Sequence, residues 1–333
     1  MAIVMGAHVK CRKSFGLPVN PPKEPDGVPC NICVNECRIP EGKAGFCGIR
    51  KNINGRLVGG SPDKGRFSWY FDLLPTNCVA DWVCPGGTGC GYPEYAYNAG
   101  PEYGFKNLAV FFQACSFNCL FCQNWHFKQE LLTSPERSVQ ELVSVIDEKT
   151  SCICYFGGDP TPQLPLALKA SQLACEQKKN RILRICWETN GSMNSALLDE
   201  MIELALSTGG SIKFDLKAWD ENLHIALTGI TNKRTKDNFI HTEERMRTRA
   251  IPPPLLANTL LVPGYIDEQE IRKIAKFIAS INPDIPYSML AYYPHFYMHD
   301  LPLTEKTFAD RCLAIASEEG LRNVRIGNKH LLS

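Results

Sequence analysis

The stretch LAVFFQACSFNCLFC, residues 108–122, joins an apolar run directly to three closely spaced cysteines. The run predicts a short buried strand that ends just before the first thiol. Cys115, Cys119 and Cys122 follow at a C-x3-C-x2-C spacing. Because four thiolates normally hold a cubane cluster, three would leave one iron open to another molecule. We therefore expect a [4Fe–4S] cluster here, with a zinc site or redox thiols as the alternatives.

Apolar and helical patterns alternate along the rest of the chain. Ser138 with Glu141 and Asp267 with Glu270 predict helix starts, and glycines predict the ends of helices 194–206 and 304–319. The alternation predicts an α/β fold with a parallel sheet. We expect its six short strands at residues 107–113, 151–156, 182–187, 211–216, 256–262 and 287–292.

Polar or glycine-rich segments follow the predicted strands, where α/β barrels carry their chemistry. Two glycines, Gly157 and Gly158, let the backbone approach a ligand closely. An acid and a base, Asp215 and Lys217, lie two residues apart and so share one face of a strand. A plain turn, a helix N-cap and a buried salt bridge are the structural alternatives for these segments.

The cysteine loop after a first strand, with the aromatic Phe121 before the last thiol, resembles the radical S-adenosylmethionine (SAM) superfamily. The resemblance implies a partial (β/α)6 TIM-type barrel. It also implies that SAM chelates the open iron and that one electron cleaves it to a 5′-deoxyadenosyl radical. In this family the segment after the second strand holds the SAM amino group with a Glu. This chain has the shorter Asp159 there, so we expect backbone carbonyls to take more of that contact.

By the same resemblance, Asp215 and Lys217 engage SAM and the reactive centre and are the expected catalytic residues. The expected SAM-binding residues are Phe121, Gly157, Gly158, Asp159, Glu188, Asn190, Asp215, Lys217 and Val262.

Residues 30–50, 122–125, 259–267 and 320–328 resemble the AmmeMemoRadiSam-type proteins, which are relatives of the pyruvate formate-lyase activating enzymes. The segment 74–90 departs from the usual linker of that family. This departure indicates a distinct subfamily with its own substrate.

Most of the 16 cysteines fall into groups. We expect a Cys-rich region at 1–100 that binds a metal or cluster and a radical SAM core at 101–333. Cys30, Cys33, Cys37 and Cys47 could hold an auxiliary iron–sulfur cluster or zinc. Cys78, Cys84 and Cys90 could join that group, hold another cluster with one outside ligand, or stay unligated. Six more are scattered, four of them in apolar or helical patterns where a thiol usually packs as a small hydrophobe.

The charge balance and the hydropathy of the chain limit the classes of partner that it is expected to bind. With 36 basic and 35 acidic residues, the chain lacks the basic surplus that nucleic-acid binding uses. No apolar run approaches the length of a membrane span, and no signal peptide pattern opens the chain. We expect a cytoplasmic protein of an anaerobic host, with no nucleic-acid or membrane partner.

The sequence thus predicts a radical SAM enzyme that abstracts hydrogen from a protein or peptide and draws electrons from a flavodoxin- or ferredoxin-type donor. Three alternatives remain: an activase that installs a glycyl radical on a partner enzyme, a non-catalytic iron–sulfur electron carrier or zinc scaffold, and a cobalamin-dependent methyltransferase.

Overall fold

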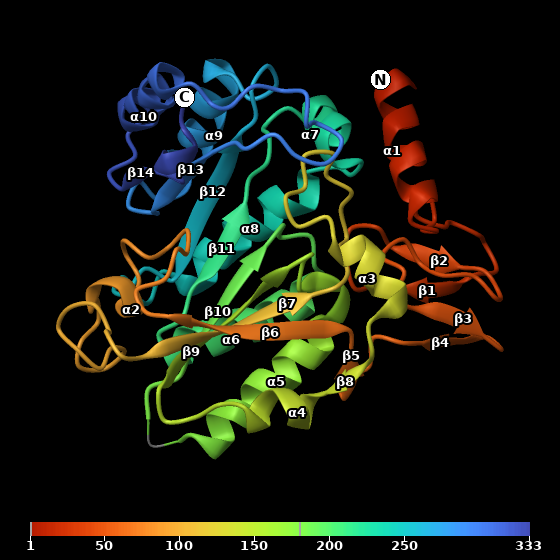
Figure 1. Ribbon diagram of the computed structural model, residues 1–333, viewed down its shortest axis with the longest axis horizontal. Helices are drawn as coiled ribbons and strands as arrows, with labels where there is room; N and C mark the ends of the chain where they lie inside the picture. Colours follow the sequence, from red (N-terminus) through yellow and green to blue (C-terminus); the bar gives the residue numbers. More distant parts are fainter. Residues whose placement is uncertain (1, 180) are drawn as a thin grey trace.

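The computed structural model describes residues 2–179 and 181–333, and an eight-stranded sheet forms its core (Figure 1). The strands lie in the order β14-β13-β12-β11-β10-β9-β7-β6. All neighbours pair in parallel except β6, which runs antiparallel to β7. The strands are β6 Phe67–Leu73, β7 Lys106–Phe112, β9 Thr150–Gly157, β10 Arg184–Thr189, β11 Ile212–Asp215, β12 Leu255–Leu261, β13 Tyr287–Ala291 and β14 Val324–Gly327.

The two ends of the sheet, β14 and β6, do not pair with each other, so the barrel is partial. This arrangement confirms the predicted α/β partial-barrel fold, and all six predicted strands are present within about two residues of their predicted bounds. The structure adds β14 as a seventh parallel strand and β6 as an antiparallel edge strand. Both were missed because β14 is only four residues long and β6 is half exposed, which weakens the apolar signal.

Helices follow the strands and flank the sheet (Figure 1). They are α4 Val139–Ser144, α5 Leu164–Gln177, α6 Ser195–Thr208, α7 Glu221–Thr228, α8 Lys233–Met246, α9 Glu268–Ile281 and α10 Lys306–Glu318. The predicted starts are confirmed. Ser138 caps α4 in a reciprocal capping box with Glu141, and the Asp267 side chain accepts from the Glu270 backbone N–H at the start of α9. Gly209 ends α6 in the left-handed conformation, with φ of 74°.

The core fills the space between the sheet and these helices. Tyr155 of β9 and Trp187 of β10 are fully buried and stack with ring centroids 4.7 Å apart. Rings of this size remove a large apolar area from water and fix the spacing of neighbouring strands. The carboxyl ends of β9 and β10 are thereby held side by side.

The N-terminal region adds short elements around the sheet. Helix α1 (Ala2–Ser14) precedes the hairpins β1 (Val28–Cys30) with β2 (Cys37–Ile39) and β3 (Lys51–Ile53) with β4 (Arg56–Val58). The remaining elements are the pair β5 (Lys64–Gly65) with β8 (Arg137–Ser138), helices α2 (Pro85–Thr88) and α3 (Phe127–Thr133), and the 3-10 turns at Thr161–Gln163 and Lys329–Leu331.

Hairpins β1–β4 and helix α2 lie on opposite sides of the molecule in Figure 1. The predicted division at residue 100 stays a prediction, since β6 precedes it yet pairs along its whole length with β7. Within the described ranges, no helix combines the length and the apolar character that a membrane crossing requires.

Candidate active site

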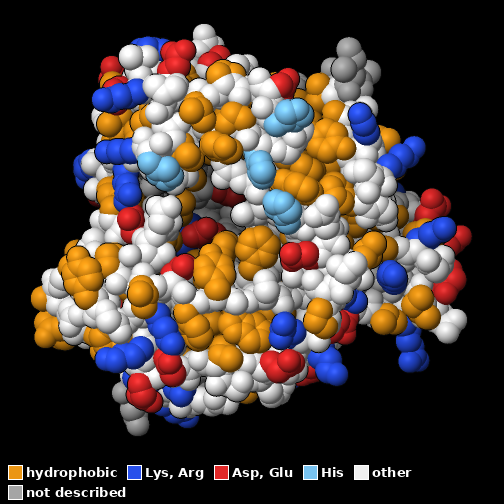
Figure 2. Space-filling view, in the orientation of Figure 1, with side chains coloured by type: hydrophobic (Ala, Val, Ile, Leu, Met, Phe, Trp, Pro, Cys, Tyr) orange, Lys and Arg blue, Asp and Glu red, His pale blue; other side chains and the backbone are white. Residues whose placement is uncertain are grey.

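A cavity opens where β7, β9, β10, β11 and β12 end, with about 1190 Å³ of space unfilled by protein atoms and partly open to solvent. Figure 2 shows this face of the molecule hollowed near its middle, with acidic side chains at depth. The predicted residues that line the cavity are Cys115, Cys119, Phe121, Cys122, Gly157, Gly158, Asp159, Glu188, Asn190, Asp215 and Lys217. Val262 lies outside the lining and is fully buried, whereas Asn258 and Leu260 of the preceding strand β12 line it.

The cysteine loop is held in place by its neighbours. The backbone N–H groups of Asn118 and Leu120 donate to the carbonyls of Thr228 and Leu227, at 2.8 and 3.0 Å. The Cys115 sulfur accepts from the Phe117 N–H at 3.3 Å. Because the middle of the loop is anchored to the end of α7, its thiols are held in place at the cavity.

None of the three thiols is in a disulfide; Cys119 is buried, and Cys115 and Cys122 are partly buried. Burial raises the pKa of Cys119 to about 12, although the nearby Lys217 ammonium acts in the opposite direction. Iron–sulfur ligands are thiolates, and bound metal supplies the positive charge that favours this form. The donor set therefore fits an iron–sulfur cluster.

Gly157 and Gly158 bring the end of β9 against the cysteine loop. Gly157 has φ of 107°, which side-chain-bearing residues rarely adopt. A Cβ at Gly158 would lie 2.3 Å from the Ala114 carbonyl oxygen, and the Gly158 N–H donates to the Phe112 carbonyl at 2.8 Å. Only glycine fits here, and both glycines line the cavity.

Asp159 connects the loops that follow β9 and β10. Its carboxylate accepts from the Thr161 N–H at 2.9 Å, the Thr189 hydroxyl at 3.2 Å and the Asn190 N–H at 3.3 Å. Burial raises the pKa of Asp159 to about 6. Since these donors already engage its oxygens, the side chain fixes the surrounding backbone, and that backbone faces the cavity.

Asp215 and Lys217 form an ion pair of 2.7 Å at the end of β11. The Asn258 amide donates to the other Asp215 oxygen. Burial would lower the pKa of Lys217, but the charges of Asp215 and Cys119 outweigh it and raise that pKa. The Lys217 nitrogen lies 5.7 Å from the centre of the Phe121 ring, so the pair stands beside the cysteine loop.

Lys128 of α3 is a cavity residue that the sequence analysis missed. Its side chain is only 2% exposed and donates to the Asn118 side chain at 2.9 Å. Burial lowers the pKa of Lys128. Lys128 lies six residues after Cys122, and no repeating apolar pattern around it predicts that it is buried. It returns to the cysteine loop because the chain turns there and begins helix α3.

The N-terminal group Cys30, Cys33, Cys37 and Cys47 gathers around the β1–β2 hairpin, where Cys30 faces Cys37 in register. Burial raises the pKa of Cys33, and negative charge on the other three sulfurs would raise it further. Across residues 2–179 and 181–333, no three His, Cys, Asp or Glu side chains converge on a single ion position. The choice between a cluster and zinc stays a prediction.

The structure separates the other three cysteines that the sequence grouped. Cys78 and Cys84 reach a second cavity inside the barrel, while Cys90 lies outside its lining. They do not join the N-terminal group, because α2 and the β1–β4 hairpins lie on opposite sides of the molecule (Figure 1).

The model of the Radical SAM superfamily matches residues 109–278, which is half of the chain, and the chain belongs to this superfamily. Membership confirms the predicted cofactors, a [4Fe–4S] cluster and SAM. It also confirms the prediction that the protein is an enzyme. The predicted resemblance to activating enzymes is also confirmed by the relatives.

A Methanocaldococcus jannaschii protein, provisionally named as a glycyl-radical enzyme activating enzyme, is 32% identical over 183 residues; the match spans 54% of this chain and 64% of that protein. The pyruvate formate-lyase-activating enzyme of Staphylococcus aureus is 30% identical over 198 residues, covering 55% of this chain and 73% of that enzyme. An uncharacterized M. jannaschii protein is 26% identical over 309 residues, covering 90% and 81%. A solved domain of the pyruvate-formate lyase-activating enzyme from Bacteroides vulgatus has 20% identity and a TM-score of 0.43, covering 53% of this chain and 98% of that one.

Proposed function

We propose that the chain cleaves SAM reductively at a [4Fe–4S] cluster held by Cys115, Cys119 and Cys122, and abstracts hydrogen from a protein or peptide. The supporting observation is that these thiols share one cavity with the Gly157–Gly158 backbone and the Asp215–Lys217 pair. A cluster with three protein thiolates keeps one iron open. SAM can take that position only if its other groups find partners nearby, and this cavity offers them.

Each residue has a proposed role in holding SAM. Backbone carbonyls at Gly157 and Gly158 accept hydrogen bonds from the ammonium group. Asp159 follows them directly, and its bond from the Asn190 N–H ties this backbone to the loop after β10. Lys217 is a cation that a carboxylate in the cavity can pair with, and Asp215 keeps it oriented at 2.7 Å. Asn190 donates to the Ser116 hydroxyl at 2.8 Å and holds the cysteine loop as well as the cavity wall. When bound, the cluster and SAM together supply the 5′-deoxyadenosyl radical; the chain positions them and excludes water.

We propose a protein or peptide as substrate because two of the relatives carry names of enzymes that activate other enzymes. Each reductive cleavage consumes one electron, so an external donor of the flavodoxin or ferredoxin class is part of the proposal. The same names favour a second candidate, an activase that leaves a glycyl radical on a partner enzyme. The reaction after hydrogen abstraction distinguishes the two.

The test compares Cys119→Ala with Cys175→Ala, which changes a thiol of α5 far from the cysteine loop in sequence. Anaerobically reconstituted protein is given dithionite and SAM, and 5′-deoxyadenosine is quantified. We expect product from the wild type and from Cys175→Ala, and none above background from Cys119→Ala. Product formation by Cys119→Ala at the wild-type rate would refute the assignment of the cluster.

The activase candidate is tested on a co-expressed glycyl-radical enzyme. A stable glycyl radical signal by electron paramagnetic resonance, dependent on Lys217 and SAM, would identify an activase. A modified polypeptide without a stable radical would identify the first candidate. A reduced cluster whose spectrum SAM does not perturb would instead indicate an electron carrier.

A further inference from the structure

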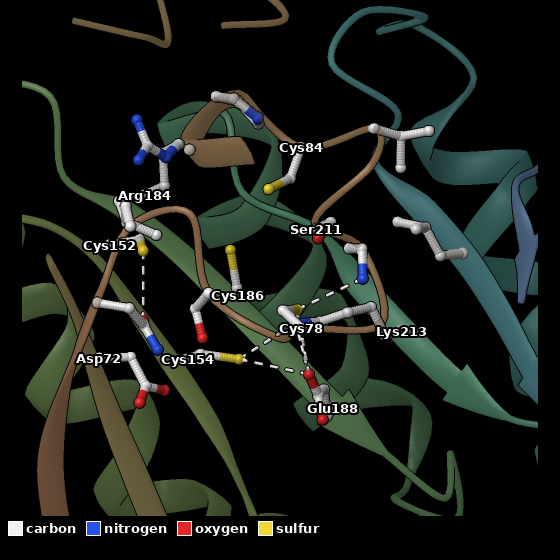
Figure 3. A pocket seen from close by; sticks show the side chains of 18 of the residues that line it. Asp72, Cys78, Cys84, Cys152, Cys154, Arg184, Cys186, Glu188, Ser211 and Lys213 are labelled. Carbon is white, nitrogen blue, oxygen red and sulfur yellow. Dashed lines mark hydrogen bonds and ion pairs between the residues drawn. The ribbon is translucent and has the colours of Figure 1, made fainter. Parts of the chain in front are cut away.

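A second cavity lies inside the barrel and adjoins the first, since Phe156 and Glu188 line both. It encloses about 830 Å³ unfilled by protein atoms, part of it open to solvent. Five thiols line it, and Figure 3 shows how they lie. They are Cys78, Cys84, Cys152, Cys154 and Cys186.

Two different parts of the chain supply these thiols. Cys152 and Cys154 stand two apart on β9 and therefore point to the same face, and Cys186 lies beside Cys154 in the parallel register of β10. Cys78 and Cys84 come from the segment 74–90, whose helix α2 begins directly after Cys84. The sequence placed some of these thiols in the apolar core and others in a loop, and the fold brings them together.

A buried lysine stands among the thiols. The Lys213 nitrogen lies 3.2 Å from the Cys78 sulfur and 3.2 Å from the Cys154 sulfur, so these sulfurs are at most twice that distance apart. Lys213 also pairs with Glu188 at 2.9 Å, and its side chain is only 2% exposed. A buried ammonium needs compensating negative charge. Glu188 provides one carboxylate, and that residue also lines the neighbouring cavity.

The sulfurs of Cys78, Cys84, Cys154 and Cys186 point toward one region in Figure 3. Cys152 donates to the Asn107 side chain at 3.2 Å, while Cys78 and Cys154 both donate to Glu188, at 3.4 and 3.9 Å. Buried thiols in an ordinary core pack against apolar side chains. Here four thiols surround unfilled space next to the Lys213 ammonium. A positive charge in this position favours the thiolate form, which is the form that binds metal.

We propose that Cys78, Cys84, Cys154 and Cys186 hold a second iron–sulfur cluster, with Lys213 donating hydrogen bonds to two of the ligating sulfurs. Four thiolates complete a cubane, so this cluster would have no open iron. Each thiol gives up its proton to solvent as its iron–sulfur bond forms. The two sulfurs that contact Lys213 each lie 3.2 Å from its nitrogen.

The two proposed clusters share no cysteine ligand, although Glu188 lines both cavities. The hydrogen bonds from Lys213 to sulfur belong to the contacts that set the potential of an iron–sulfur cluster. Loss of this second cluster would leave the Cys115, Cys119 and Cys122 loop intact. The two proposals can therefore fail separately.

The test counts iron and sulfide in the anaerobically reconstituted full-length chain. Cys154→Ser/Cys186→Ser removes two ligands from the strands, and Cys78→Ser/Cys84→Ser removes two from the linker. We expect each double variant to lose about four irons and four sulfides per chain relative to the wild type, with loss of the same reduced-cluster signal. The control Cys175→Ser/Cys312→Ser changes two thiols outside both cavities and should keep the full content.

SAM-dependent change in the spectrum of the remaining cluster checks that each variant is folded. If the strand variant does not fold, the linker variant decides, because Cys78 and Cys84 lie outside the sheet. Wild-type iron content in a folded double variant would overturn the proposal. Loss of zinc with unchanged iron would overturn it equally.

Discussion

The buried ion pair between Glu102 and Arg184 gives a sharp test of how the linker is held against the barrel. Arg184 of β10 donates to both carboxylate oxygens of Glu102, at 2.8 and 2.6 Å. The two side chains are 2% and 0% exposed. Arg184 also donates to the Tyr95 carbonyl at 2.8 Å, so one guanidinium fastens two points of the segment between β6 and β7.

Removing one partner of such a pair leaves an uncompensated buried charge, which costs about 3–5 kcal/mol. An unfolding entropy of about 2.1 cal/mol/K per residue gives about 0.7 kcal/mol/K for 333 residues. Glu102→Gln should therefore lower the melting temperature by about 4–7 °C if the chain unfolds as one unit. Differential scanning calorimetry of the reconstituted protein measures this shift.

The matched control is Asp284→Asn, which breaks the exposed pair with Arg322. That pair has a similar length, 3.0 Å, but its side chains are 66% and 58% exposed. Exposed pairs contribute about 0–1 kcal/mol, so the control should shift the melting temperature by less than about 1.5 °C. Equal shifts for the two variants would refute the argument from burial.

The Glu102 pair also has a defined pH dependence. Burial alone would raise the pKa of Glu102, but the hydrogen bonds and charge of Arg184 hold it below its ordinary value. Its contribution to stability is therefore present at neutral pH and is lost as the pH falls through the folded pKa. The difference in unfolding free energy between wild type and Glu102→Gln should therefore become smaller as the pH is lowered.

Three further predictions concern the SAM cavity. Gly158→Ala should weaken SAM binding at least tenfold by isothermal titration, because its Cβ would meet the Ala114 carbonyl at 2.3 Å, while Gly100→Ala meets nothing within 4 Å and should bind normally. Lys217→Met should reduce 5′-deoxyadenosine formation by about tenfold or more, the equivalent of about 1.4 kcal/mol, whereas Lys106→Met, which breaks a pair at the surface, should not. Because burial raises the pKa of Asp159 to about 6, the folded chain keeps a proton that the unfolded chain releases from about pH 4 upward. Unfolding free energy should thus fall by about 1–3 kcal/mol across pH 4–6, and Asp159→Asn should flatten that slope; an unchanged slope contradicts the burial argument.

Most of the barrel could be predicted because its strands are apolar on both faces and its helices carry clear caps. Asn194, Ser138 and Asp267 each accept a backbone N–H where the sequence placed a helix start. The edge strand β6 could not be predicted, because one of its faces is open to solvent and its partner is 33 residues further on in sequence. Short-range patterns carry no information about such a pairing.

The candidate site was predicted to a similar extent, and for a similar reason. Residues that follow strands in a parallel barrel meet at one edge, so the cysteine loop, the two glycines and the Asp215–Lys217 pair could be grouped in advance. Lys128 could not, since a turn of the chain returns it to the loop. Cys154 and Cys186 face the barrel interior from adjacent strands, where an apolar pattern hides the chemistry of a thiol.

The pairing of β6 with β7 has a consequence for the segment that connects them. Both ends of residues 74–105 are clamped by neighbouring strands, so the entropy of closing this loop is offset by the sheet itself. Cys78 and Cys84 are consequently delivered to the barrel wall by folding alone. The proposed second cluster would therefore be inserted into a site that the folded chain has already formed. Cluster insertion would follow folding and would not drive it.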